Sequence, residues 1–434
     1  MRLIKKIKNH KVLNNVSWIL AGRISNMILS FVVGIFSARY LGPSNYGLIG
    51  YAGAFATFFA SICSLGINSI IIKELADNKE KEGEILGTSI LLRLISSTLS
   101  FLAIQILTLF LNKEESTTKI IVLLYNINLF FQAFEIIKYW FIKQLKSKYT
   151  EIISIIAYVI TSAYKIFLLA TNKSVEWFAL SMSIDYIIIA GLLLVLYKKQ
   201  GGQKLKFSKT TGKKILKKSY HFILSGLMIS VYNSTDKLML QQMVNEKEVG
   251  LYTAAATISV LCTFIYSALI ESINPVIIER HKNKNHTYNK ANRQLYAIIF
   301  YLASFFAIGI SIFSKLITSI LYGEEYINAT SSICILSWSV VFSYLGVARD
   351  CWIVCEKKQK YLKYIYLLSA IVNIVLNAFL IPIIGATGAS IATLITQIAT
   401  IFIFPAFFKE MRPNIKLIIE GICLKNTLDK RKIK

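Results

Sequence analysis

The stretch that decides the fold runs from Ile85 to Leu111, reads ILGTSILLRLISSTLSFLAIQILTLFL, and carries one charged residue, Arg93. It exceeds the ~20 apolar residues that a helix needs to cross ~30 Å of hydrocarbon. Because hydrocarbon supplies no hydrogen-bond partners, the backbone of such a segment must pair within itself, as a helix does. Similar runs recur along the chain, of which 55% is hydrophobic. We therefore predict an all-α integral membrane protein.

About twelve transmembrane helices can be placed on this pattern, with short polar breaks between them. They lie near residues 15–38, 47–72, 85–111, 120–142, 151–171, 176–197, 219–243, 250–275, 294–314, 329–350, 362–384 and 386–408. A lysine-rich break near the middle divides them into two six-helix lobes. The predicted parts are an N-terminal lobe over 1–197, a basic cytoplasmic linker over 198–218, a C-terminal lobe over 219–408 and a basic cytoplasmic tail over 409–434.

Positive charge alternates between crowded and sparse along the successive polar breaks. Lys and Arg number 49 against 23 Asp and Glu, and most of them lie in every second break, starting with the N-terminal segment. Apart from Lys315 at the edge of a span, the intervening breaks hold only Arg39, Lys113, Lys119, Lys173 and Lys247. An excess of Lys and Arg marks cytoplasmic loops, so we predict that both termini face the cytoplasm.

The net charge of +26 needs no nucleic acid to explain it. Lysine-rich inner loops are attracted to the anionic cytoplasmic leaflet, which makes membrane lipids the expected partners. The stretch 198–218 has Phe207 as its only aromatic residue, whereas single-stranded nucleic acid is bound by basic and aromatic residues together. The six cysteines form no C-x-x-C pair, and no nearby histidine completes a metal site around Cys351 and Cys355. We expect no metal, no cofactor and no disulfide framework.

Polar residues at helical spacing indicate which helix faces turn away from the lipid. The clearest stripes are Arg23, Asn26, Ser30, Gly34 and Ser37; Ser89, Arg93, Ser96 and Ser100; Tyr125, Asn128, Gln132, Glu135 and Tyr139; Gly226, Ser230, Asn233, Lys237 and Gln241; Thr263, Ser267, Glu271 and Asn274; and Tyr366, Ser369, Asn373 and Asn377. We predict that these faces line a central polar cavity between the two lobes. For Ser, Gly and Asn, the alternative is close packing and hydrogen bonding between helices.

Charged residues inside the predicted spans are the stronger signal for function. A charge at the bilayer centre costs at least ~2.5 to 3.5 kcal/mol even on the mildest scale. Arg23, Arg93 and Lys237 lie several residues inside their spans, so we predict that they face the cavity, with a structural ion pair as the alternative. Three others lie near span ends, where snorkelling to the interface explains them: Lys138, Lys315 and Arg349.

Buried carboxylates are the matching candidates for ion coupling or charge pairing. Asp236 and Lys237 are adjacent on one helix and do not face each other, so each needs a partner elsewhere. Glu135 and Glu271 are chemically suitable, although Glu135 could pair with Lys138 one turn on. A buried carboxylate can exchange H⁺ or bind Na⁺ as the cavity changes its access. Static pairing to a cation remains the alternative for each of them.

A short internal repeat supports the two lobes. Residues 46–52 read YGLIGYA and residues 249–255 read VGLYTAA, with Gly, Leu and Ala matching at one constant offset. Each segment opens the second predicted helix of its half. Six helices per half give both halves the same orientation, which is the pattern of a parallel repeat about an axis along the membrane normal.

These residues together resemble the Wzx-type polysaccharide flippases, within the multidrug/oligosaccharidyl-lipid/polysaccharide (MOP) exporter superfamily. The resemblance is carried by Arg23, by YLGPSNYG at 40–47, by NSTDK at 233–237, by VGLY at 249–252, by LYGEEY at 321–326 and by PIIGATGA at 382–389. It spans nearly the whole chain. It implies a two-lobed transporter of twelve helices that opens alternately to either side of the bacterial cytoplasmic (inner) membrane.

The implied substrate is an undecaprenyl-diphosphate-linked oligosaccharide, moved from the cytoplasmic to the outer face for O-antigen or capsule synthesis. Polysaccharide polymerase and chain-length proteins are the implied protein partners. Because a diphosphate needs cations to replace its water, Arg23, Arg93 and Lys237 are the predicted substrate-binding residues, with Asn26 and Asn233 beside them. Three carboxylates are the predicted ion-coupling or charge-pairing groups, with H⁺ or Na⁺ as the coupling ion: Asp236, Glu135 and Glu271.

Two alternatives compete with a flippase. An ion-coupled exporter of drugs or metabolites would share the fold, but a cation exporter should concentrate acidic residues in its cavity, where this chain offers cations. A membrane-bound polysaccharide polymerase would need a large soluble loop or a catalytic carboxylate cluster. The adjacent acids Glu324 and Glu325 have no partner motif of that kind, so we expect a protein that is not an enzyme.

Overall fold

The computed structural model describes residues 2–283 and 287–425, and it describes side chains there except those of residues 2–17, 20, 21, 23, 224 and 225. The regular elements within these ranges are helices, with no β-strand among them. By internal contacts the chain forms two compact units. Unit 1 comprises Met1–Leu41 and Leu48–Ser234, and unit 2 comprises Gly42–Gly47 and Thr235–Lys434. The predicted lobe boundaries around 198–218 remain a prediction.

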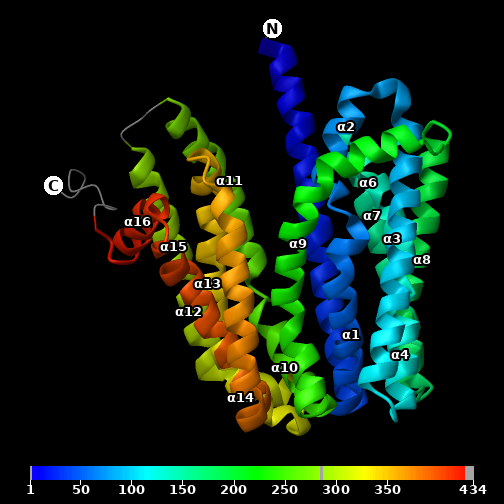
Figure 1. Cartoon of the computed structure of the whole chain (residues 1–434), viewed down its shortest axis with the longest axis vertical. Coiled ribbons are helices and arrows are strands. Elements are labelled where there is room, and N and C mark those ends of the chain that lie inside the picture. Colours follow the sequence, from blue (N-terminus) through cyan, green and yellow to red (C-terminus); the bar gives the residue numbers. More distant parts are fainter. Residues whose placement is uncertain (1, 284–286, 426–434) are drawn as a thin grey trace. The chain divides into compact units, whose positions relative to one another are not determined.

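Unit 1 is built from long helices with shorter ones between them (Figure 1). Its elements are α1 (Arg2–Ser64), α2 (Ile71–Asp77), α3 (Glu82–Leu111), α4 (Ser116–Asn126), α5 (Asn128–Gln132), α6 (Ile136–Lys143), α7 (Ser147–Ala170), α8 (Val175–Lys199) and the first part of α9 (Lys209–Met243). Three apolar side chains of α6 are fully buried in its core: Ile136, Ile137 and Phe141. The decisive apolar stretch of the sequence is α3, as predicted.

Unit 2 holds the remaining helices. They are the end of α9, α10 (Glu246–Ser259), α11 (Thr263–Lys282), α12 (Tyr288–Leu321), α13 (Thr330–Cys355), α14 (Leu362–Ile398), α15 (Phe404–Ala406) and α16 (Arg412–Ile422), with a π-helix at Ala399–Ile403. The predicted basic tail contains α16, which packs against α12. Leu417, Ile418 and Gly421 form the buried face of α16, at a helical spacing that the sequence shows.

The prediction of a multi-pass membrane protein built from apolar helices is confirmed. Among the described residues, eight helices are long and apolar enough to span a membrane, or nine if α10 and α11, bent by 43°, form one span. Two of the eight stretches, Ile24–Ser64 and Gln359–Ala406, have 41 and 48 residues, about twice the ~20 that one crossing needs. Gly42 (φ 69°) and Gly385 (φ 52°) break them in left-handed conformations that suit glycine. The count of twelve stays a prediction.

Gly47 and Gly250, one from each copy of the internal repeat, lie at a close backbone contact within unit 2. A Cβ on Gly47 would collide with the backbone carbonyl of Glu246, and a Cβ on Gly250 would collide with that of Pro43. In each case the carbonyl lies four residues before the other glycine, so the two contacts mirror each other. Glycine at both positions therefore lets residues 43–47 cross α10 at backbone distance.

The basic stretch 198–218 is part of unit 1 and contacts the start of α3. The amide of Lys206 donates to the Gly83 carbonyl at 3.1 Å, and the Gly83 amide donates to Gln203 Oε1 at 3.0 Å. The chain turns helical at Lys209, ten residues before the predicted span, and the lysines of this first part of α9 reach Glu74 of α2. These ion pairs join the start of α9 to a helix that lies more than a hundred residues earlier in the chain.

Candidate functional site

Asp236 lies on α9 within unit 2 and is surrounded by neutral hydrogen-bond donors. Its side chain is 5% exposed. One carboxylate oxygen accepts from Asn377 Nδ2 at 2.6 Å, and the other accepts from the hydroxyls of Tyr252 and of Thr393, the latter at 2.8 Å. Among the described residues, no basic side chain forms an ion pair with it. The observed environment of Asp236 therefore differs from a static pair with an arginine or lysine.

The Asp236 environment is rich in oxygen. Asn377 Nδ2 also donates to Asn373 Oδ1 at 3.1 Å, while the buried Asn377 Oδ1 has no hydrogen-bond partner. Hard cations take carboxylate, amide and hydroxyl oxygens as ligands. The described residues contain no group of three or more His, Cys, Asp and Glu side chains suited to a metal. The Asp236 cluster (Asp236, Tyr252, Asn373, Asn377 and Thr393) can hold a proton or a small monovalent cation.

The other predicted residues around α9 and α11 differ in exposure. Lys237 is half-buried, and it leaves the helix about 100° away from its neighbour Asp236. Asn233 and Glu271 are exposed. Asn233 belongs to unit 1, whereas Lys237 and Glu271 belong to unit 2.

Arg93 is the buried cation of unit 1. It lies on α3, is 5% exposed, and donates from Nη1 to Asn68 Oδ1 at 3.4 Å. Its Nε is buried with no hydrogen-bond partner. Within the described part of the chain, no carboxylate oxygen lies within 4 Å of its guanidinium group. Arg93 thus keeps donors that a bound anion can use, because a guanidinium presents five N–H groups in a planar fork.

The remaining predicted residues of unit 1 are only partly connected. The side chain of Arg23 lies outside the described residues. Asn26 is half-buried, and its Oδ1 has no partner. Glu135 forms an ion pair with Lys138 at 2.5 Å, which confirms the local pairing that the sequence suggested as an alternative. No described hydrogen bond joins Asn26 to Arg93.

The expectation that Arg349 snorkels to the membrane interface is wrong, because its side chain is buried. Its side chain on α13 is 1% exposed, and Nη1 donates to the Thr400 carbonyl at 3.0 Å. Thr400 lies in the π-helix, where the widened turn redirects a carbonyl from the regular helical ladder. The position of Arg349 near a predicted span end gave no sign of this burial, because the deciding contact comes from residue 400.

Sequence reasoning also missed part of the Asp236 cluster. Asn373 and Asn377 were visible as a polar stripe with four-residue spacing. Thr393 gave no signal, since a single hydroxyl in an apolar helix is typical of helix packing. Tyr252 was noted only as part of the repeat.

The chain is similar in sequence to proteins of surface polysaccharide synthesis. It is 23% identical to a putative O-antigen transporter of Salmonella typhimurium over 193 residues, which cover 43% of this chain and 44% of that protein. It is 20% identical to the capsular polysaccharide biosynthesis protein CapF of Staphylococcus aureus over 408 residues, or 92% of this chain and 100% of that one.

Solved structures show the same fold. The lipid II flippase MurJ in an inward closed conformation matches with a TM-score of 0.71 at 15% identity, over 95% of this chain and 90% of that one. An inward-facing multidrug resistance MATE transporter of the MOP superfamily matches with a TM-score of 0.66 at 16% identity, over 91% of this chain and 96% of that one. A family model described as polysaccharide biosynthesis protein matches residues 12–281, more than half of the chain, and the protein belongs to this family.

Proposed function

We propose that the protein is a flippase that moves undecaprenyl-diphosphate-linked oligosaccharides from the cytoplasmic to the outer face of the membrane by alternating access. The products would feed O-antigen or capsule synthesis. The family, the two relatives named for O-antigen transport and capsule synthesis, and the flippase fold support this proposal. The single observation within the chain that carries it is the buried, incompletely bonded Arg93.

A buried arginine with spare donors suits an anionic substrate. Burying a charge in the membrane is costly, so an arginine without a carboxylate partner needs another compensating group. A diphosphate supplies negative oxygens that a guanidinium binds with two parallel hydrogen bonds. We assign Arg93 to the diphosphate or to an acidic sugar, and we propose Arg23, Lys237, Asn26 and Asn233 as further substrate contacts.

The Asp236 cluster supports coupling to an ion. A carboxylate held by Tyr252, Asn377 and Thr393 offers several oxygens around one negative charge. Binding and release of Na⁺ or H⁺ there would make the preferred conformation depend on the ion gradient, because a ligand shifts an equilibrium by its differential affinity for the two states. We propose Asp236 as the coupling group and keep Glu271 and Glu135 as the alternatives.

The remaining features of the proposal follow from the charge pattern and the family resemblance. The basic breaks support a bacterial cytoplasmic membrane protein with both termini in the cytoplasm. Polymerase and chain-length proteins would act beside it on the translocated repeat units. Transport without a catalytic step fits the relative named as an O-antigen transporter and the structure named as a lipid II flippase.

A MATE-like exporter of drugs or metabolites is the second candidate, supported by the shared fold. The two are separated in a deletion strain by extracting lipid-linked intermediates and by staining surface polysaccharide. We expect undecaprenyl-linked repeat units to accumulate and surface polysaccharide to disappear, with recovery by the wild-type chain and by Lys113→Ala, which removes an exposed charge, but not by Arg93→Ala. Normal polysaccharide together with altered drug sensitivity would reject the flippase in favour of the exporter.

A further inference from the structure

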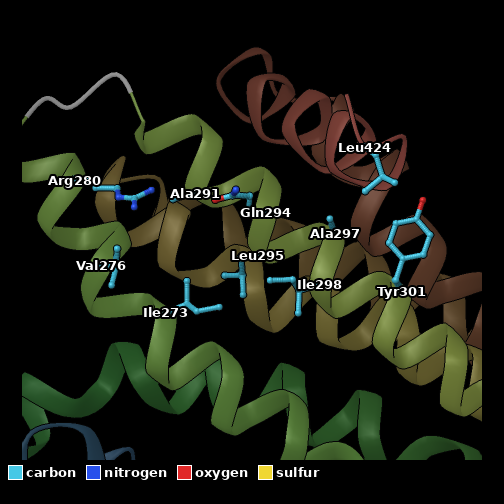
Figure 2. A pocket seen from close by; sticks show the side chains of 10 residues that line it. All are labelled: Ile273, Val276, Arg280, Ala291, Gln294, Leu295, Ala297, Ile298, Tyr301 and Leu424. Atoms are coloured by element: carbon cyan, nitrogen blue, oxygen red, sulfur yellow. The ribbon is translucent and has the colours of Figure 1, made fainter. Parts of the chain in front are cut away.

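A pocket of about 590 Å³ opens between α11 and α12 in unit 2, far along the chain from the substrate residues proposed above (Figure 2). Its floor is formed by Ala291 and Leu295, which are buried, and its apolar walls include Val276, Ile298 and Leu424. Figure 2 shows Arg280 at one end of the pocket and Tyr301 at the other, beneath Leu424. The pocket is therefore apolar along most of its length and cationic at one end.

The contacts of α16 fix one wall of this pocket. Arg293 Nη1 forms an ion pair with Glu420 at 2.6 Å, and Asn414 Nδ2 donates to the Tyr296 hydroxyl at 2.8 Å. The Tyr301 hydroxyl donates to the Ile422 carbonyl at 2.7 Å, just before Leu424. These bonds hold the end of α16 against α12, so the wall is a built part of unit 2.

The residues that line the pocket lie where predicted membrane spans end and a basic break begins. Its apolar residues Ile273, Leu295 and Ile298 fall within the predicted membrane spans 250–275 and 294–314, whereas Arg280 lies in the basic break predicted between these spans, in the last turn of α11. From Arg280 to Arg293 the sequence contains no Asp or Glu. Basic pockets between transmembrane helices at the cytoplasmic side are typical binding places for anionic lipid headgroups.

We propose that this pocket binds an anionic glycerophospholipid of the surrounding membrane. An acyl chain would lie along Leu295 and Ile298, and the phosphate would accept hydrogen bonds from the Arg280 guanidinium. A phosphodiester carries one negative charge, which a single arginine matches, whereas a prenyl diphosphate carries more charge than Arg280, the one cation among the described residues that line the pocket. The volume also lies in the range of ordinary small-ligand pockets, roughly 300 to 1,000 Å³.

The test uses the purified full-length protein in detergent, titrated with phosphatidylglycerol or phosphatidylcholine and analysed by native mass spectrometry. We expect phosphatidylglycerol to be retained and Arg280→Gln to weaken its apparent affinity roughly tenfold, since a hydrogen bond to a charged group contributes about 1.5 kcal/mol or more. The matched control Lys282→Gln removes an exposed charge two residues away and should change the affinity less than twofold. Equal losses in the two variants would show unspecific surface attraction and overturn the proposal.

A second pair of variants tests the apolar part. Ile298 and Ile308 lie on the same helix and are 44% and 48% exposed, but only Ile298 lines the pocket. Ile298→Trp should abolish retention of phosphatidylglycerol, whereas Ile308→Trp should leave it unchanged. Retention in both variants would reject the site.

Two further measurements test other occupants of the pocket. Preferential displacement of phosphatidylglycerol by undecaprenyl phosphate would reassign the pocket to the prenyl carrier. Tenfold tighter binding after removal of residues 426–434 would reassign it to the chain's own tail.

Discussion

Replacing Asp236 by asparagine separates a structural role of this residue from ion coupling. The wild-type carboxylate accepts three hydrogen bonds, from Tyr252, Asn377 and Thr393. In the variant, the amide oxygen can still accept from Asn377. The new amide group can donate to the two hydroxyls, because a hydroxyl both donates and accepts. The number of hydrogen bonds is therefore preserved and only the charge is lost.

The free-energy change follows from this exchange. A hydrogen bond to a charged group contributes about 1.5 to 3 kcal/mol, and one between neutral groups about 0.5 to 1.5 kcal/mol, so three weakened bonds cost roughly 3 to 4 kcal/mol. Removing the charge also removes a desolvation penalty of several kcal/mol. The two effects nearly cancel, so we expect Asp236→Asn to reach the membrane in an amount within about twofold of the wild type. Asp236→Ala leaves donors unpaired and should reduce the amount much further.

The assay compares membrane abundance with translocation of lipid-linked oligosaccharide in inverted vesicles, with and without Na⁺ and proton gradients. We expect Asp236→Asn to insert normally and to lose the stimulation that the coupling gradient gives the wild type. Glu114→Gln makes the same isosteric change at an exposed carboxylate outside the proposed site and serves as the control, with stimulation retained. The reasoning is refuted if the Asn variant keeps full stimulation, or if it disappears from the membrane as the Ala variant does.

Four further predictions follow from single contacts. Arg93→Ala should abolish complementation at normal protein level and Arg93→Lys should restore it only partly, because lysine lacks the planar fork; full complementation by the Ala variant in a polysaccharide assay would remove Arg93 from the site. Gly250→Ala places a methyl group against the Pro43 carbonyl and should destabilise the protein by about 1 to 3 kcal/mol in thermal unfolding, whereas Gly309→Ala, with nothing within 4 Å of the new Cβ, should not lower the melting temperature. Glu74→Gln should release the start of α9 from α2 and speed hydrogen exchange over 209–218, with unchanged exchange counting against the ion pairs as its anchor. Cysteine labels at Lys247 and Gly202 should report opposite sides of the membrane, and labelling from one side alone would contradict the predicted topology.

The apolar fold was predictable because a membrane imposes one rule on every crossing segment. A run such as 85–111 has no alternative to a helix in hydrocarbon, and α3 follows it closely. The breaks at Gly42 and Gly385 fall between predicted spans, and both glycines adopt positive φ. The helical start of α9 was not predictable from hydropathy, because Lys214 and Lys218 pair with Glu74, more than a hundred residues earlier in the chain.

The candidate site was predictable by residue type and only partly by contact. A charge within a span is costly wherever it lies, so Arg93 and Asp236 could be selected from their positions alone. Their partners depend on which helices pack together, and this information is absent from any single helix. Arg349 shows the limit most clearly: residue position predicted an interfacial side chain, while the carbonyl of Thr400 holds it in the core.

Two of the buried charges, Arg93 and Asp236, lie in different units. Unit 1 holds Arg93, a cation whose donors are not matched by any described carboxylate, so it suits an anionic ligand. Unit 2 holds Asp236, an anion surrounded by neutral oxygen and amide groups, so it suits a cation. Because Arg93 and Asp236 lie in different units and neither forms an ion pair among the described residues, an anionic substrate and a coupling ion need not compete for the same group. In the proposed transport cycle, coupling between the two would then act through conformation and not through direct displacement.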